Sequence, residues 1–423
     1  MRAPTAVLRQ EKLQAVLRVA SGNFLEMYDF MIFGYFSAAI GRAYFPAKSE
    51  FASLMLSLTT FAIGFMMRPL GAIFLGAYID HRGRRKGLLV TLALMSVGTL
   101  TIALVPGYET IGLFAPILVV LGRLCQGFSA GAELGGVSVY LSEIATPGHK
   151  GFYVAWQSGS QQIAVVFAGV LGFALSSWMP PEQMQAWGWR IPLLVGCLII
   201  PFIYLIRRGL RETEEFAART HPPSPSQICA GMLADWRIIA AGMAMVLMTT
   251  VSFYTITAYT PTFGLTVLKL SQSDALLVTL CVGMSNLFWL PLMGSLSDRV
   301  GRRPLLYGFA SLAVVSAYPT MAWLVDQPTF VKLLSVELWL SFIYAGYNGA
   351  MVVHLTEIVP VAVRTAGFSL AYSLATMVGG ATPAIVTYLI HTTGNRAMPG
   401  AWLSVAALIA WISVWITRPR VLD

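Results

Sequence analysis

The stretch GAYIDHRGRRKG, residues 76–87, returns later in the chain as GSLSDRVGRRP, residues 294–304. Four of its residues recur with the same offset of 218 positions: Gly76 as Gly294, Asp80 as Asp298, Gly83 as Gly301, and Arg84 as Arg302. A second repeat with an offset of 214 positions relates YLSEIATPGHKG to HLTEIVPVAVRT and pairs Glu143 with Glu357. Two repeats with nearly equal offsets indicate a duplicated structural unit.

The composition places this duplicated unit in a membrane. Of the 423 residues, 57% are hydrophobic and 11% are charged, whereas about a quarter of a soluble protein is charged. Because a membrane span needs about 20 apolar residues, the length allows twelve spans. The apolar runs between charged or Gly/Pro-rich breaks predict helices at 17–42, 51–79, 87–105, 111–144, 151–177, 188–208, 237–264, 274–297, 304–324, 332–358, 363–390 and 400–417.

We therefore expect an all-α polytopic membrane protein with twelve transmembrane helices in two six-helix bundles. The predicted amino-terminal bundle covers 1–208, a charged and proline-containing linker covers 209–236, and the carboxy-terminal bundle covers 237–423. The predicted loops on the side of both termini hold 20 of the 28 Lys and Arg residues. By the positive-inside rule this side is cytoplasmic, which predicts a multi-pass protein of the cell inner membrane. The net charge of +9 is then a topology signal, and we expect no nucleic-acid partner.

Two arginines are predicted to lie deep inside spans, at Arg68 in the second helix and Arg123 in the fourth. A guanidinium near the middle of a bilayer costs at least ~2.5 kcal/mol, so such residues are rare and usually functional. Each guanidinium can hold one carboxylate through two hydrogen bonds. The pair therefore predicts a binding pocket for a small anion with several carboxylates. The alternative is that both arginines pair permanently with nearby acids.

The proton-coupling candidates are three carboxylates, Glu26, Asp29 and Glu133, which the sequence predicts to be the only ones well inside the spans. An anion that binds or leaves beside a buried carboxylate changes the affinity of that carboxylate for a proton, which would couple the two. Glu26 and Asp29 are three residues apart and share one face of the first helix. Asp29 is the deeper of the two and our first choice, with Glu133 as its rival.

Neutral polar residues predicted at a similar depth are further candidates for substrate contacts. In the first half these are Asn23, Tyr28, Gln157 and Gln161. The second half has no Lys or Arg inside a predicted span, and its candidates are Tyr344, Tyr347 and Asn348. Hydrogen bonding between helices explains such residues equally well. His354, near the cytoplasmic end of the tenth helix, is a candidate gate residue, although a single histidine there can also be structural.

The repeated loop G-x-x-x-D-x-x-G-R-[RK] resembles the signature loop of the major facilitator superfamily. The segments SGNFLEMYDFMIFGYF, MMRPLGAIFLGAYIDHRGRRKG and WGWRIP further resemble the metabolite:proton symporters, and most closely the citrate and tricarballylate carriers. The resemblance covers nearly the whole chain. It implies a carrier that works by alternating access, that moves tricarboxylates together with protons, and for which a monomer is sufficient.

Charged residues of the repeated loops are predicted to form a cytoplasmic gate. We expect each aspartate to begin the third or ninth helix, where its carboxylate faces a positive helix end. The arginine of each loop could then reach the glutamate that ends the fourth or tenth helix. If these charges did not form a gate, they would serve only to set topology. The predicted gate residues are Asp80, Arg84, Glu143, Asp298, Arg302 and Glu357.

The resulting prediction is a proton-coupled importer of a tricarboxylate, most readily citrate. Tricarballylate, dicarboxylates and α-ketoglutarate are alternative substrates, and a carrier of a zwitterion such as proline or betaine is a more distant alternative. A membrane enzyme is disfavoured because no nucleophile with a base, metal-ligand spacing or nucleotide motif is present in the sequence. We accordingly expect no cofactor and no metal.

Overall fold

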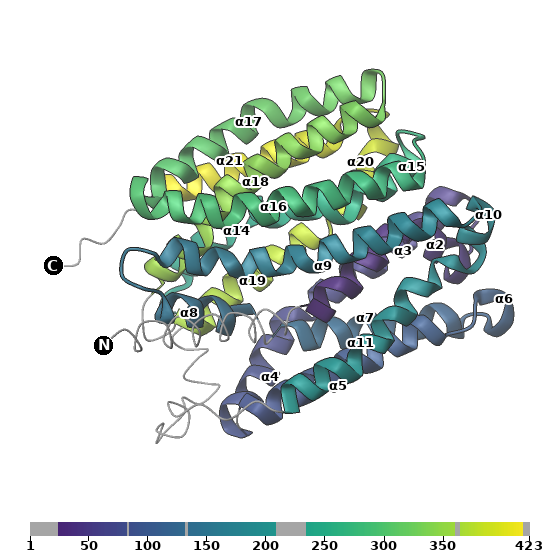
Figure 1. Ribbon diagram of the computed structural model, residues 1–423, viewed down its shortest axis with the longest axis horizontal. Coiled ribbons are helices and arrows are strands. Elements are labelled where there is room, and N and C mark those ends of the chain that lie inside the picture. The colour runs from purple at the N-terminus through teal and green to yellow at the C-terminus, as the bar shows by residue number, and fades with distance from the viewer. Residues whose placement is uncertain (1–23, 83, 132–133, 209–233, 360–363, 418–423) are drawn as a thin grey trace, which may run out of the picture.

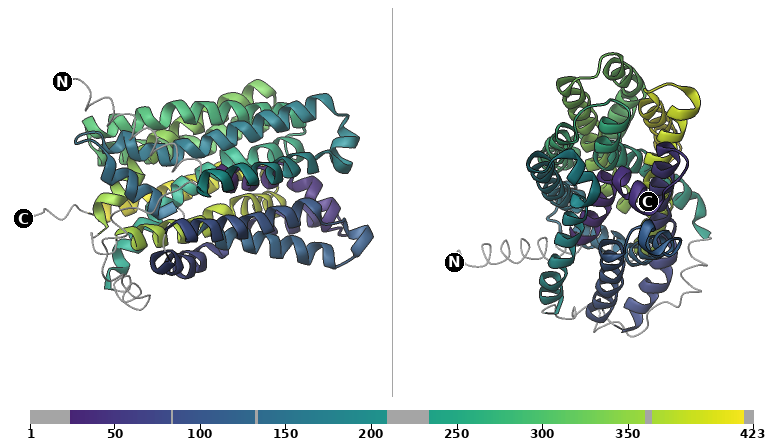
Figure 2. Two further views of the ribbon diagram at one scale, coloured as in Figure 1. Left: turned by 60° about the horizontal axis from the view of Figure 1, so that its bottom comes forward. Right: turned by 90° about the vertical axis from the view of Figure 1, so that its right-hand side faces the viewer.

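The computed structural model describes residues 24–82, 84–131, 134–208, 234–359 and 364–417, and every regular element within them is helical. The helices run side by side along the long axis of the molecule and form two groups (Figure 1). The end view shows the groups next to each other, with the colours of the first half on one side and those of the second half on the other (Figure 2).

The first group begins with helical residues 24–35 and ends at Arg208. Short helices join the longer ones at the end of the molecule opposite the repeated loops. Its elements are α2 (Ser37–Tyr44), α3 (Glu50–Met66), α4 (Arg68–Arg82), α5 (Arg84–Leu104), α6 (Tyr108–Ile111), α7 (Phe114–Ala130), α8 (Leu134–Ile144), α9 (Lys150–Trp178), α10 (Pro181–Gln183), η1 (Met184–Gly188) and α11 (Arg190–Arg208).

The second group begins at Trp236, so the predicted linker at 209–236 lies almost entirely outside the described residues. Its elements are α14 (Trp236–Tyr254), η2 (Thr255–Tyr259), α15 (Thr260–Thr266), α16 (Gln272–Val300), α17 (Arg302–Asp326), α18 (Phe330–Ile358), α19 (Arg364–Gly380), α20 (Thr382–Thr393) and α21 (Met398–Ile416). The division into two bundles at the predicted boundaries stays a prediction.

Within the described residues, eight helices are long and apolar enough to cross a membrane, or nine if the bent pair Pro181–Gly188 and Arg190–Phe202 counts as one span. Leu89–Leu104 and Phe114–Ala130 are shorter apolar helices, and the predicted first span begins outside the described residues. Large apolar side chains cover the outer surface of these helices, as lipid contact requires. The most exposed of them are Trp178, Val315, Leu113, Phe114, Leu198 and Phe202.

Several helices are interrupted, and a proline explains the break in two of them. Because a proline has no N–H and its ring crowds the carbonyl four residues earlier, it interrupts the helical ladder. Pro69 follows the break between α3 and α4. Pro261 follows the π-helical segment η2, which widens the seventh long helix between α14 and α15. Segments of this kind occur often at functional sites.

The two groups of helices meet along two seams. In the first seam α9 packs along α16, and in the second α3 and α4 pack against α19 and α20. Glycines permit the closest approach, because a side chain on Gly151 or Gly294 would overlap the backbone of the other helix. We call the end that holds the α8–α9 and α16–α17 connections the signature-loop end, and the other the opposite end (Figure 1).

Candidate functional site

Arg68 and Arg123 lie in the interior of the first group, with 2% and 0% of their surface exposed. Arg68 is the first residue of α4, directly after the break in the second long helix, and Arg123 lies within α7. α4 and α7 approach closely because glycines line their contact: a side chain on Gly131 would overlap the backbone carbonyl of Arg68. The fold thus places two guanidinium groups on neighbouring helices in a water-poor interior.

Arg68 forms an ion pair with an acid from the first helix. Its Nη2 lies 2.7 Å from Oε1 of Glu26, and both side chains are buried. Each partner of such a buried pair compensates the charge of the other. Removal of either partner would leave an uncompensated charge in the protein interior, which is costly. The alternative reading of the sequence, that the deep arginines pair with nearby acids, therefore describes Arg68 in this conformation.

Arg123 is held by neutral groups. Its Nη1 donates to Oε1 of Gln126 over 2.7 Å, and its Nη2 donates to the carbonyl of Phe61 over 3.4 Å. The amide of Gln126 in turn donates to Oδ2 of Asp29 over 3.3 Å, and Thr99 donates to the same oxygen. Gln126 therefore bridges Arg123 and Asp29, so that the arginine and the acid are linked through one side-chain amide.

Glu26 and Asp29 serve different arginines although they belong to the same helix. Glu26 faces Arg68 on α4, whereas Asp29 points its Oδ1 toward Gly196 on α11 and its Oδ2 toward α5 and α7. The sequence expected the two acids to share one environment because they are three residues apart. The structure separates their partners because α4 on one side and α5, α7 and α11 on the other pack against the first helix.

Aromatic rings cover the faces of both guanidinium groups. Phe30 lies between them, with its ring centroid 5.0 Å from Cζ of Arg68 and 4.1 Å from Cζ of Arg123. Phe65 covers Arg68 further, and Phe33 and Phe61 cover Arg123. The rings stabilise the cations and keep water away, and they leave the N–H edges free for acceptors. Nε of each arginine has no hydrogen-bond partner, so each retains an unused donor.

The second half closes the site from across the seam. The ring of Tyr254 on α14 packs 4.9 Å from that of Phe65, and Gly380 of α19 lies against the same ring. Tyr254 and Tyr372 are both close enough to Arg68 to interact with it electrostatically. The second half therefore contacts Phe65, one of the rings that cover Arg68, so relative movement of the halves would change the surroundings of this arginine.

The predicted amides on α9 and α18 are buried and only partly bonded. Gln157 accepts from Ser158 over 2.8 Å, whereas its amide nitrogen has no partner. Asn348 donates to Tyr344 over 3.4 Å, whereas its carbonyl oxygen has no partner. Gln161 is 6% exposed on the same helix as Gln157. An unused amide donor and an unused acceptor are suited to a ligand that carries carboxylates and a hydroxyl.

Tyr28 and Tyr347 are held by backbone carbonyls of their own halves in this conformation. The hydroxyl of Tyr28 donates to Pro192 on α11 over 2.6 Å, and that of Tyr347 donates to Met245 on α14 over 3.0 Å. Both contacts join helices within one half, so they contribute to packing there. Asn23 and Glu133 lie outside the described residues.

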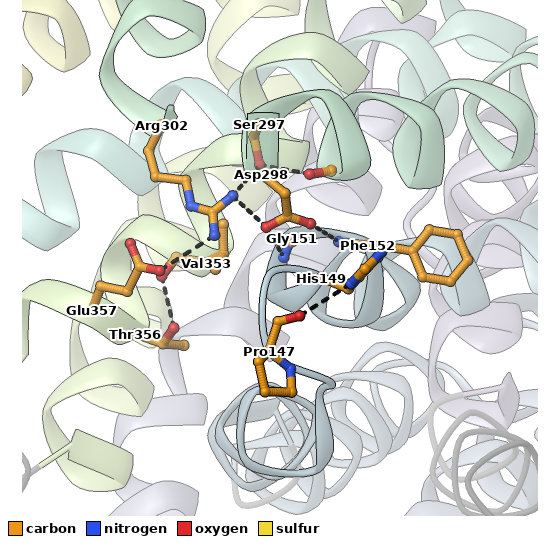
Figure 3. A network of polar contacts seen from close by, with 11 residues as sticks. Pro147, His149, Gly151, Phe152, Ser297, Asp298, Arg302, Val353, Thr356 and Glu357 are labelled. Atoms are coloured by element: carbon orange, nitrogen blue, oxygen red, sulfur yellow. Dashed lines mark hydrogen bonds and ion pairs between the residues drawn. The ribbon is translucent and has the colours of Figure 1, made fainter. Parts of the chain in front are cut away.

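The charged residues of the second signature loop form a network at the signature-loop end (Figure 3). Nη1 of Arg302 lies 2.7 Å from Asp298 and 2.7 Å from the hydroxyl of Ser297, and its Nη2 lies 3.3 Å from Glu357. The contact between Arg302 and Glu357 that the sequence predicted is therefore present. Its role as a gate stays a prediction.

Asp298 differs from the prediction. It lies in the last turn of α16, and α17 begins only at Arg302, so Asp298 does not begin the ninth helix. Its carboxylate instead accepts hydrogen bonds from the backbone N–H of Gly151 over 2.8 Å and of Phe152 over 3.1 Å (Figure 3). These groups form the positive amino-terminal end of α9 in the other half. The predicted contact with the start of the ninth helix is therefore wrong, because the positive helix end that contacts Asp298 belongs to α9.

The first signature loop is described less completely. Asp80 lies in the last turn of α4, so it does not begin the third helix either, because α5 starts at Arg84. The side chains of Asp80 and Arg84 lie outside the described part of the structure, and Glu143 is exposed near the end of α8. His354 is 6% exposed within α18, and its Nε2 has no partner.

The two halves also meet at the opposite end. Thr262 on α15 donates to the carbonyl of Gly34 over 3.2 Å, and the ring of Phe51 stacks on His391 with centroids 3.7 Å apart. With Asp298 joining the halves at the signature-loop end, contacts between the halves exist at both ends of the described structure. The arginines are thus enclosed in this conformation.

Three buried polar residues were missed by the sequence analysis. Gln126 follows Arg123 by three residues and Thr99 lies on α5, and both complete the surroundings of Asp29. The expectation that only Glu26, Asp29 and Glu133 lie well inside the spans was wrong, since Glu337 on α18 is 1% exposed. Gln126 could have been found from the sequence, because its spacing of three residues from Arg123 places both on one face of a helix.

Among the described residues, no group of three or more His, Cys, Asp or Glu could hold a metal ion.

Comparison with known proteins defines the class of protein. The Major Facilitator Superfamily profile matches residues 19–383, and the chain belongs to this family. The fold agrees with that of the xylose transporter XylE from E. coli in a partially occluded inward-open conformation, with a TM-score of 0.78 at 18% identity, covering 96% of this chain and 98% of the other. The chain is accordingly a multi-pass membrane transporter and not an enzyme.

Two curated relatives are much closer in sequence. The chain is 60% identical over 398 residues to the citrate-proton symporter of Klebsiella pneumoniae, covering 94% of this chain and 90% of the relative. It is 58% identical over 404 residues to the citrate-proton symporter of Salmonella typhi, covering 95% and 93%. The resemblance to citrate carriers inferred from short segments therefore extends along nearly the whole chain.

Proposed function

We propose that this chain imports citrate together with protons by alternating access. The near-complete coverage and high identity to two citrate-proton symporters support the cargo and the coupling ion. The position of 20 of the 28 Lys and Arg residues in the loops of one predicted side supports an inner-membrane carrier with both termini in the cytoplasm. The signature-loop end is then the cytoplasmic end. We propose that a monomer is sufficient, because the site is built within one chain.

The observation that carries this proposal is a pair of buried guanidinium groups with one phenyl ring between them. Citrate has three carboxylates and a hydroxyl, and Arg68 and Arg123 can each hold one carboxylate with paired N–H groups. We propose that Phe30 swings aside or slides when citrate enters, since it occupies the space between the two cations. The third carboxylate and the hydroxyl would meet neutral groups, for which we propose Asn23, Tyr28, Gln157, Gln161, Tyr344, Tyr347 and Asn348.

Competition for Arg68 supplies the link between citrate and the proton. A citrate carboxylate that binds Arg68 must displace Glu26, which would then lose its ion pair with Arg68 while it is buried, and that loss is costly. Glu26 avoids that cost by taking up a proton as citrate binds. Conversely, a proton on Glu26 releases Arg68 for citrate. Each event favours the other, which is the thermodynamic requirement for symport.

Arg123 offers a second link of the same kind through Gln126. A carboxylate that binds Arg123 displaces the side-chain oxygen of Gln126 from the guanidinium. The hydrogen bond from the amide nitrogen of Gln126 to Asp29 then changes as well. We propose Asp29 as the proton carrier on this branch. We propose Glu26 as the first candidate for the proton-coupling residue because of its ion pair with Arg68. The role of Glu133 in proton coupling stays a prediction.

The contacts at the signature-loop end suit an inner gate. Asp298 joins the halves through the start of α9, and Arg302 holds both Asp298 and Glu357 in place. We propose that these contacts break when citrate is released into the cytoplasm. The repeated residues Asp80, Arg84 and Glu143 would act in the same way in the other half. We propose His354 of α18, which lies near Arg302 and Arg303, as a further gate residue.

Uptake into proteoliposomes tests the function. With an inward proton gradient, labelled citrate should accumulate, and a protonophore should abolish the accumulation. Tricarballylate, α-ketoglutarate and proline, offered separately, should be taken up less well. Preferred uptake of any of these, or accumulation that ignores the proton gradient, would overturn the assignment.

Binding to the purified protein tests the site. Citrate affinity should fall at least tenfold in Arg68→Ala and Arg123→Ala, because each loses about 1.4 kcal/mol or more of charge-assisted bonding. Arg42→Ala is the matched control, since Arg42 is exposed and its distance to Glu50 is 3.7 Å. Unchanged citrate affinity in both Arg68→Ala and Arg123→Ala would show that these arginines do not bind citrate. That result would not affect the conclusion from the transport assay.

A further inference from the structure

Glu337 is a buried carboxylate that the proposed citrate site does not use. It lies in α18 of the second half and is 1% exposed. Its Oε1 is 3.1 Å from the hydroxyl oxygen of Thr260, and its Oε2 has no hydrogen-bond partner. A carboxylate is rarely placed in such surroundings without a role, because burial of a charge is costly unless the charge is paired.

The contacts of Thr260 indicate which protonation state fits. The same hydroxyl lies 3.1 Å from the carbonyl of Thr255 and 3.1 Å from Oε1 of Glu337. A hydroxyl has one hydrogen and cannot donate fully to two acceptors. If Glu337 carries a proton, its O–H donates to Thr260 and Thr260 donates to Thr255, so both contacts are satisfied. If Glu337 is ionised, Thr260 must abandon one of its acceptors.

Among the residues that the structure describes, no cation forms an ion pair with Glu337. On α18 the nearest cation in sequence is Lys332, whose ammonium bonds to the carbonyl of Trp323. On the facing segment η2, the hydroxyl of Tyr259 accepts a hydrogen bond from Thr387. The hydroxyl of Thr260 is the hydrogen-bond partner of Oε1 of Glu337, and Oε2 has no hydrogen-bond partner within the described part of the chain. The neutral form is thus the one that these neighbours accommodate.

Thr260 lies at the junction between the π-helical segment η2 and helix α15. It is the first residue of α15, directly after the π-helical segment Thr255–Tyr259. Two residues further on, Thr262 bonds to the carbonyl of Gly34 in the other half, and Gly34 also packs against Ala258. The segment that closes the opposite end is therefore tied to α18 through Thr260 and Glu337.

We propose that Glu337 is a second proton-binding site, in the second half of the carrier, which is occupied while the opposite end is closed. When that end opens, water reaches the carboxyl group and the proton can leave. The hydroxyl of Thr260 then turns its hydrogen to the carboxylate and gives up Thr255, which frees α15 to move. Proton binding from outside reverses these steps and closes the end. Only the link to transport rests on the proposed function.

Distance measurements on the citrate-free protein test the proposal. Spin labels at cysteines that replace Glu50 and Lys269 report the separation of the two halves at the opposite end, with the four native cysteines replaced. In the parent protein the closed population should rise as the pH falls. Glu337→Gln, whose amide can donate to Thr260 permanently, should be closed at every pH. A parent protein whose closed population ignores pH, or a Glu337→Gln variant that still titrates like the parent, overturns the proposal.

Companion variants separate the switch from a packing effect. Thr260→Ser retains the hydroxyl and should behave as the parent, whereas Thr260→Val should lose the pH response and open more often. Ser335→Ala, on an exposed face of the same helix as Glu337, is the matched control, because its hydroxyl bonds to the carbonyl of Val331.

If Glu337→Gln does not fold, infrared difference spectra provide the test. A protonated-carboxyl band at neutral pH should be present in the parent protein and should persist in Asp29→Asn. Its disappearance in Asp29→Asn would assign the proton to Asp29 and refute the site at Glu337. Because citrate is absent from these tests, their failure is distinct from failure of the proposed function.

Discussion

The carboxylate of Glu26 lies 2.7 Å from the guanidinium of Arg68, which joins the first helix to the second across a water-poor interior. This pair has the form expected of a resting state, in which a protein acid occupies the place that we propose for a substrate carboxylate. The phenyl ring of Phe30 then separates this pair from Arg123. Resting and loaded states would differ in which carboxylate faces Arg68 and in where the proton resides.

Glu26→Gln should remove the competition for Arg68. Citrate affinity at alkaline pH is expected to rise by about tenfold, equivalent to about 1.4 kcal/mol, and the dependence of affinity on pH should become shallower. Titration calorimetry at several pH values measures both effects. An affinity that stays as steeply dependent on pH as in the parent would contradict the competition between Glu26 and citrate.

Arg68→Lys and Arg123→Lys should impair citrate binding although the charge is retained. A lysine offers one point charge on a flexible stem, whereas a guanidinium holds a carboxylate with two parallel bonds and stacks on the rings of Phe30 and its neighbours. We expect a loss of about tenfold in affinity for each variant. Arg42→Lys, at an exposed position of α2, should bind as the parent does, and equal binding by all three variants would show that charge alone is sufficient.

Gln126→Leu should disconnect Arg123 from Asp29, because leucine matches the size of the amide but can neither accept from the guanidinium nor donate to the acid. Counterflow exchange of citrate should persist, since it needs no net proton movement, while uptake driven by a proton gradient should fall at least about fivefold. The ratio of the two rates in proteoliposomes measures the effect. If both rates fell equally, Gln126 would be a packing residue only.

Asp298→Asn should weaken the closure of the signature-loop end. Asparagine has one acceptor oxygen and no charge, so it bonds less strongly to the N–H groups of Gly151 and Phe152 at the start of α9. A cysteine at Ala155, which packs against Gly294 between α9 and α16, should react about tenfold faster with a maleimide. Asp326→Asn, an exposed acid at the opposite end, is the control, and equal labelling rates in the two variants would remove Asp298 from the gate.

Gly131→Ala should destabilise the fold of the arginine site. The added carbon would overlap the carbonyl of Arg68 on α4, and backbone atoms there cannot move aside as a flexible side chain can. Overpacking of this kind costs about 1–3 kcal/mol, so thermal unfolding in detergent should occur at a lower temperature. Gly308→Ala on α17 has open space at the same position and should unfold like the parent. Equal stability of both variants would mean that α4 and α7 can separate at no cost.

Several features of the site followed from the sequence alone. The repeated loops and the interior position of Arg68 and Arg123 could be inferred, because they depend on the identity and spacing of residues along the chain. The partner of each acid could not be inferred, because Glu26 and Asp29 are three residues apart and yet face different helices. The burial of Glu337 could not be inferred for a similar reason. Glu337 lies near the start of a predicted helix, and the packing of neighbouring helices is what buries it.

The sequence by itself determined that this protein is a helical membrane protein with two repeated loops and with two buried arginines in its first half, since composition, the two repeats and the placement of charge are properties of the chain. Only the tertiary structure decided that Asp298 caps α9 of the other half, that Gln126 stands between Arg123 and Asp29, and that Glu337 meets Thr260. The physical reason is that hydrogen bonds and ion pairs between helices depend on their relative rotation and translation. These are fixed by close packing of many side chains along the whole seam, and no short segment of sequence encodes them.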